Sequence, residues 1–93
     1  MTKDLNNHHR DTLAALHAHP VSHNIRWVDA VSLAAAVGDV EDRHDGRVKI
    51  TIGGQAQVFD RPHGKDLDTQ QVLDLRHMFD AAGYTAPSHD RED

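Results

Sequence analysis

Cysteine is absent from this chain of 93 residues, and aromatic residues make up only 4% of it. Without cysteine, disulfides and thiolate zinc sites are excluded, and a cytoplasmic location is the simplest expectation. The longest apolar run, Leu33–Val37, is far too short to cross a membrane, and the N-terminal stretch MTKDLNNHHRD has no apolar core that would predict a signal peptide. A core with so few aromatic side chains is thin, so a homodimer would be an ordinary way of adding stability.

Positive charge is scarce over the whole chain but concentrated in its middle. The formal net charge is −5, which argues against strong nonspecific binding to nucleic acid. Between Arg43 and Lys65, however, five basic residues accompany only two acidic ones, so this segment carries +3 and the remainder −8. Such a segment can bind a phosphate backbone or an acidic partner, and the alternative is ordinary solvated charge on an exposed sheet.

Capping residues and apolar spacing predict two helices in the first half of the chain. The first runs over about Asn7–Ala18 and ends before Pro20, because the residue preceding proline is disfavoured in a helix. The second covers roughly Ile25–Val37, with Ser22 or Asn24 as the expected N-cap. Its apolar stripe, suited to packing on a sheet, consists of Trp27, Val28, Val31, Leu33, Ala34 and Val37. We expect Gly38 to end this helix in the left-handed conformation.

Alternating apolar residues and glycine turns predict an antiparallel meander after the second helix. The register between the second and third strands is left undecided. A strict two-residue turn at Gly53-Gly54 would set the apolar Val58 opposite the charged Lys49, and a longer loop or a bulge would remove that conflict. The expected strands are Asp39–Arg43 or His44, then Arg47–Ile52 after an Asp45-Gly46 turn, then Gln55–Asp60.

A closing helix is predicted from a capping box, in which Asp68 is the N-cap and Gln71 stands three residues later, and Gly83 ends this helix. Residues 1–84 are therefore expected to form one α+β domain, and residues 85–93 a disordered tail. The expected architecture is two-layer α-β-β-β-α, with a three-stranded antiparallel sheet and an extra N-terminal helix at about residues 7–18.

Nine histidines raise the question of a metal site, but none of them lies in an HExxH motif or another compact ligand spacing. No metal and no other cofactor is predicted. The serines lie outside any nucleophile-elbow motif, and Gly53-Gly54 is not followed by the elements of a phosphate-binding loop.

The loop after the third strand holds Arg61, His63 and Lys65 within five residues. Such a group can bind a phosphate or an acidic group, and Arg47 and Lys49 would extend it as a basic stripe across the open sheet face. The alternative is a structured connection between strand and helix, in which Asp66 and Asp68 neutralise the loop and support the helix N-terminus.

The same region carries a family pattern, a Val/Pro-His-Gly-Lys-Asp-Leu stretch followed by a hydrophobic helix that ends in Ala-Gly. It resembles the C-terminal half of the HicA toxin family, over about Val58–Gly83 by motif and Trp27–Tyr84 by element order. The resemblance implies a double-stranded-RNA-binding-like fold, mRNA cleavage and a HicB-type antitoxin partner. The matching residues are Val58, Pro62, His63, Gly64, Lys65, Asp66, Leu67, Thr69, Leu75, Ala82 and Gly83.

The chain departs from this family at the catalytic position. The resemblance places the catalytic histidine at the start of the second strand, where Arg47 stands here, and arginine cannot act as a general base at neutral pH. His44 and His63 are then the acid/base candidates. We predict a non-catalytic module that binds RNA or a protein, and the alternative is an active RNA-cleaving toxin of a toxin–antitoxin pair. Arg47, Lys49, Arg61 and Lys65 would contact the RNA backbone.

Overall fold

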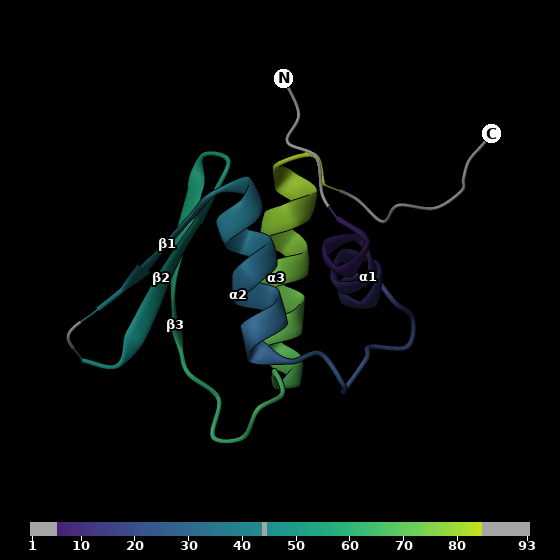
Figure 1. Ribbon diagram of the computed structural model, residues 1–93, viewed down its shortest axis with the longest axis horizontal. Helices are drawn as coiled ribbons and strands as arrows, with labels where there is room; N and C mark the ends of the chain where they lie inside the picture. Colours follow the sequence, from purple (N-terminus) through teal and green to yellow (C-terminus); the bar gives the residue numbers. More distant parts are fainter. Residues whose placement is uncertain (1–5, 44, 85–93) are drawn as a thin grey trace.

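A three-stranded antiparallel sheet covered on one face by helices forms the frame of the protein (Figure 1). The computed structural model describes residues 6–43 and 45–84. The fold class is α+β, as predicted, and the strand order in the sheet is β1-β2-β3. The elements are α1 (Asn7–Leu16), α2 (Trp27–Val37), β1 (Asp39–Asp42), β2 (Arg47–Ile52), β3 (Gln55–Asp60) and α3 (Thr69–Ala81).

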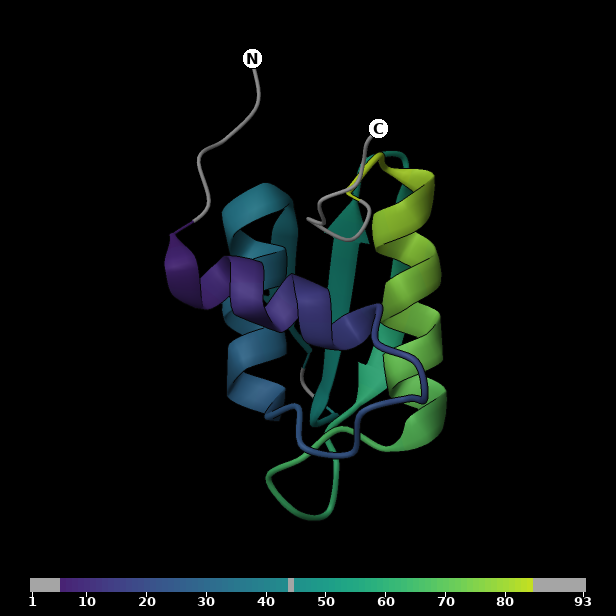
Figure 2. The same cartoon turned by 90° about the vertical axis from the view of Figure 1, so that its right-hand side faces the viewer.

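The helices form two successive layers on the sheet. Helices α2 and α3 lie side by side against one sheet face, and α1 crosses their outer side (Figure 2). The apolar face of β2 points into the core, where Val48, Ile50 and Ile52 are all buried. The predicted stripe of α2 needs one correction, because Val28 is 65% exposed and Ala30 is fully buried in its place.

The start of α2 is set by the loop that precedes α3. The N–H of Trp27 donates to the carbonyl of Lys65, and the N–H of Leu67 donates to the carbonyl of Ile25, both at 2.8 Å. Arg26 is therefore held in extended backbone opposite Asp66, and α2 begins at Trp27, two residues later than predicted. Its N-cap is Arg26, whose side chain makes no capping hydrogen bond, and not Ser22 or Asn24.

The turn at Gly53-Gly54 resolves the open register in favour of the strict two-residue form. Gln55 pairs with Ile52, and Val58 pairs with Lys49. The backbone of Gly53 has φ +63°, as the first position of such a hairpin turn requires. Val58 therefore lies on the open face of the sheet, with 43% of its surface exposed.

Gly38 ends α2 for a reason that differs from the prediction. Its φ of −151° lies outside the left-handed region, so the left-handed assignment is wrong. The position excludes a side chain because an added Cβ would collide with the carbonyl oxygen of Thr51 on β2. Glycine is thus needed where the end of α2 meets the central strand.

Helix α1 buries Leu13 and Leu16 in the core and is also attached to the other two helices by polar side chains. The Arg76 guanidinium on α3 donates to the carbonyls of Leu16 (2.7 Å) and Ala18 (3.0 Å), which lie at the C-terminal end of α1. Three of the nine histidines add further polar contacts: His8 with Asp29 (2.8 Å), His9 with Ser32 (3.0 Å) and His17 with Asp80 (2.7 Å).

We expect Arg76→Ala to lower the free energy of unfolding by about 1–3 kcal/mol, because two carbonyls at the end of α1 lose a charged donor. Urea unfolding followed by circular dichroism measures the change. His77→Ala, at the exposed neighbouring position of α3, is the control and should have little effect. Equal losses in the two variants would show that these hydrogen bonds do not hold α1 in place.

Candidate functional site

The predicted phosphate-binding residues lie on the open face of β2 and in the loop after β3. Arg47 is the first residue of β2, and its Nε atom lies 3.0 Å from Oδ1 of Asp60 and 3.9 Å from Oδ2 of Asp45. The guanidinium is therefore already engaged by carboxylates of β3 and of the β1–β2 turn. Such exposed pairs contribute only about 0–1 kcal/mol, so a ligand or partner can replace them.

The other three basic residues have different surroundings. The Nη2 atom of Arg61 lies 2.8 Å from Oδ1 of Asp42. Lys49 is half-buried and pairs in register with Glu41 on one side and Val58 on the other. Lys65 is exposed at the end of the loop.

Strand β1 brings acidic residues beside the segment that looks positive in the sequence. Asp39, Glu41 and Asp42 precede that segment in the chain, but β1 pairs directly with β2. Counted over residues 39–68, seven acidic residues accompany five basic ones, so the folded region is net negative. The sheet face is therefore of mixed charge, and phosphate binding by its basic residues stays a prediction.

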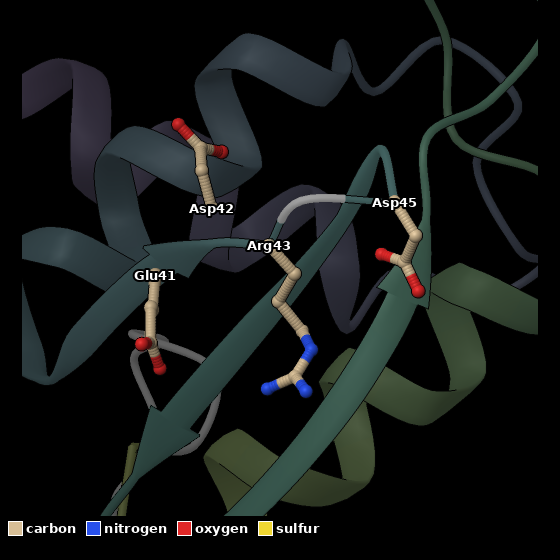
Figure 3. Close-up of a pocket in the computed structure, with 4 residues that line it drawn as sticks. All are labelled: Glu41, Asp42, Arg43 and Asp45. Carbon is tan, nitrogen blue, oxygen red and sulfur yellow. The ribbon is translucent and has the colours of Figure 1, made fainter.

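An open hollow of about 310 Å³ lies at the β1–β2 hairpin (Figure 3). Its lining contains three carboxylates and one guanidinium, from Glu41, Asp42, Arg43 and Asp45. Figure 3 shows Glu41, Arg43 and Asp45 extending to one side of the hairpin and Asp42 to the other. The surplus of carboxylates makes this end of the sheet unsuited to an RNA phosphate.

The Arg61–Lys65 loop borders a second hollow, of about 490 Å³. His63 lines it and is exposed, so its ring is accessible to a ligand. The other acid/base candidate, His44, lies outside the described residues. Among the side chains that the structure places, His63 is thus the remaining candidate from the sequence.

The loop is held at both of its ends. Asp68 caps α3 and forms the predicted capping box with Gln71. The Gln71 side chain, 8% exposed, also donates from Nε2 to the carbonyl of Asp60 at the end of β3 (2.6 Å). The predicted role of Asp68, which supports the helix N-terminus in a structured connection between strand and helix, is confirmed. The link from Gln71 to β3 was missed, because a capping box specifies contacts within its own helix only.

The described residues hold no cluster of metal ligands. Within residues 6–43 and 45–84, no three His, Asp or Glu side chains gather in a group able to hold a metal ion. In the same ranges no helix has the length and apolar character needed to cross a membrane.

The candidate site is thus a sheet face of mixed charge beside a loop fixed by backbone and capping hydrogen bonds. Arg47 lies at the end of the sheet face nearest the loop, next to Asp60. Comparison with protein-family models, with curated proteins and with solved structures found no match to this chain.

Proposed function

We propose that this chain is a HicA-like domain that binds a protein partner and does not cleave RNA. The observation that carries the proposal is Arg47, which holds the first position of β2 with its guanidinium 3.0 Å from Asp60. The family resemblance expects the catalytic histidine at that position. A guanidinium cannot accept a proton at neutral pH, so the position lacks a general base.

Charge on the open sheet face favours a protein over RNA. Alternating residues place Asp39, Glu41 and Asp60 on the same face as Arg47 and Lys49. RNA binding draws its affinity from phosphate neutralisation, which a face with matched charges supplies poorly. Mixed charges instead give specificity and register to protein interfaces. The expected partner is therefore an antitoxin-like protein whose surface carries the complementary pattern of charges.

An RNA-cleaving toxin is the second candidate, and one observation favours it. His63 and Arg61 line the same 490 Å³ hollow, together with Asp60 and Asp68. An imidazole in the same hollow as a guanidinium can transfer a proton while the guanidinium holds a phosphate, which is the chemistry of RNA cleavage. On this alternative His63 carries the reaction from the loop and not from β2.

Labelled RNA incubated with the purified protein separates the two candidates. We expect the RNA to stay intact. We also expect no salt-sensitive binding, which would show as an affinity that falls steeply between about 50 and 200 mM salt. His63→Ala is compared with His19→Ala, which changes an exposed histidine outside the loop. Cleavage that is lost in His63→Ala and kept in His19→Ala would establish the toxin and overturn the proposal.

Co-expression with the protein encoded by the neighbouring reading frame tests the partner directly. We expect the two chains to copurify, and Lys49→Glu to weaken the complex at least about tenfold, because Lys49 lies at the centre of the sheet face. Lys65→Glu makes the same charge change in the loop and should weaken it less. A complex that tolerates Lys49→Glu would place the interface elsewhere.

A further inference from the structure

Strand β3 is an edge strand with little protection. It pairs with β2 on one side, and no other described strand pairs with its second side. Native edge strands are usually short or carry a charge, a proline or a bulge that prevents pairing with another chain. The other edge, β1, fits this rule with four residues, three of them acidic. By contrast, Gln55–Phe59 contains no charge and no proline, and its continuous register has no bulge.

The two-residue turn determines which backbone groups of β3 face outward. In such a hairpin the residues that flank the turn, here Ile52 and Gln55, form a hydrogen-bonded pair. Because the pattern alternates along an antiparallel strand, Gln57 also points its N–H and C=O toward β2. Those of Ala56 and Val58 point away from it, toward the open edge.

The helices leave this strand accessible on both faces. Gln55, Ala56, Gln57 and Val58 are all exposed. On the helix side Gln57 reaches Asp74 of α3 through a 3.0 Å hydrogen bond, yet it stays exposed. On the open face Val58 is 43% exposed, and it is one of three large hydrophobic side chains that are exposed in the described residues.

We propose that β3 pairs with β3 of a second copy of the chain, antiparallel about a two-fold axis at Val58. This register sets Val58 opposite the same residue of the other copy and Ala56 opposite Asp60. No like charges face each other, and two β-branched side chains meet at the centre. Self-pairing of β1 would oppose carboxylates in every antiparallel register that pairs three or more of its residues, because three of the four are acidic.

A second copy fits this edge better than an unrelated strand. The neutral segment is self-complementary, and an isologous contact about a two-fold axis closes with two chains. A 93-residue domain with 4% aromatic residues also gains stability from added buried surface. The result is a continuous six-stranded sheet that presents both open faces on the same side, so that two partner sites lie next to each other.

The lack of cysteine allows a direct test by cross-linking. In a hydrogen-bonded antiparallel pair the two Cα atoms are about 5.5 Å apart, within the range that a disulfide spans. We expect Val58→Cys to form a disulfide-linked dimer under mild oxidation. Two controls, Ala56→Cys and Val28→Cys, should cross-link at least about tenfold more slowly. In the proposed register the two Ala56 residues are displaced by four positions, or about 13 Å, and Val28 lies exposed on α2.

Light scattering on the cysteine-free chain gives an independent readout. We expect a mass near twice 10.4 kDa at high concentration. In Val58→Glu the new carboxylate faces Lys49 within one chain but lies opposite its own copy across the two-fold axis. The repulsion should raise the dissociation constant of the dimer at least about tenfold. Val28→Glu, the same change on α2, should leave the dimer intact.

Three results would overturn the pairing: a wild-type chain that is monomeric at every concentration, a dimer that Val58→Glu leaves unchanged, or equal cross-linking of Val28→Cys and Val58→Cys. These measurements use the chain alone. Their failure would therefore leave the outcome of the RNA and partner assays unaffected, and failure of those assays would leave the dimer standing.

Discussion

Replacing Gly38 by alanine is expected to lower the free energy of unfolding by about 3 kcal/mol. The new Cβ would collide with the carbonyl oxygen of Thr51 and would lie 3.3 Å from the Cα of Ile52, and both atoms belong to the backbone of β2. A backbone atom of the central strand cannot rotate away as a side chain can. Either α2 shifts or the pairing of Asp39 with Thr51 is distorted. Urea denaturation followed by circular dichroism measures the loss.

Gly54→Ala is the matched control for this substitution. It adds the same methyl group to a glycine that has no heavy atom within 4 Å of the new Cβ. We expect a change within about 0.5 kcal/mol, as for other exposed positions. If the two variants lost similar stability, the effect would come from the general cost of replacing glycine and not from contact with Thr51.

Local signals were sufficient to predict the two best-defined strands. The alternation of Arg47–Ile52 and the Gly53-Gly54 turn gave the bounds of β2 and β3 correctly. These signals act between residues that are neighbours in the chain. The start of α2 was missed because Ile25 pairs with Leu67, and the role of Gly38 was missed because it depends on Thr51. Both depend on contacts between distant parts of the chain.

The charge of the candidate site was misjudged for a similar reason. A count that starts at Arg43 excludes the acidic residues of β1, which the hairpin places beside the basic ones. The predicted Asp45-Gly46 turn pointed to this pairing. In the structure, however, the N–H of Arg43 donates to the carbonyl of Arg47 at 2.8 Å, so the connection is one residue longer. As a result Glu41 faces Lys49, where a two-residue turn would have placed Asp42.

The histidines show how composition can mislead about chemistry. Their number raised the question of a metal site, which the sequence did not support, and His8, His9 and His17 help to attach α1 to α2 and α3. Their spacing in the sequence does not predict this, because it depends on how α1 crosses the two helices. His63 keeps its place as a functional candidate because it lines a hollow and is exposed.

Phe79→Ala is expected to lower the free energy of unfolding by about 3–5 kcal/mol. Phe79 is fully buried in α3, and its ring meets Tyr84 edge-on with centroids 6.3 Å apart, so truncation leaves a cavity and removes an aromatic pair. The free energy of unfolding of such domains is only about 5–15 kcal/mol, so the expected loss is a large fraction of it. Leu73→Ala, on the same helix but 38% exposed, is the control and should cost much less in thermal and urea unfolding. Equal losses would mean that α3 does not hold the sheet and α1 together through its buried face.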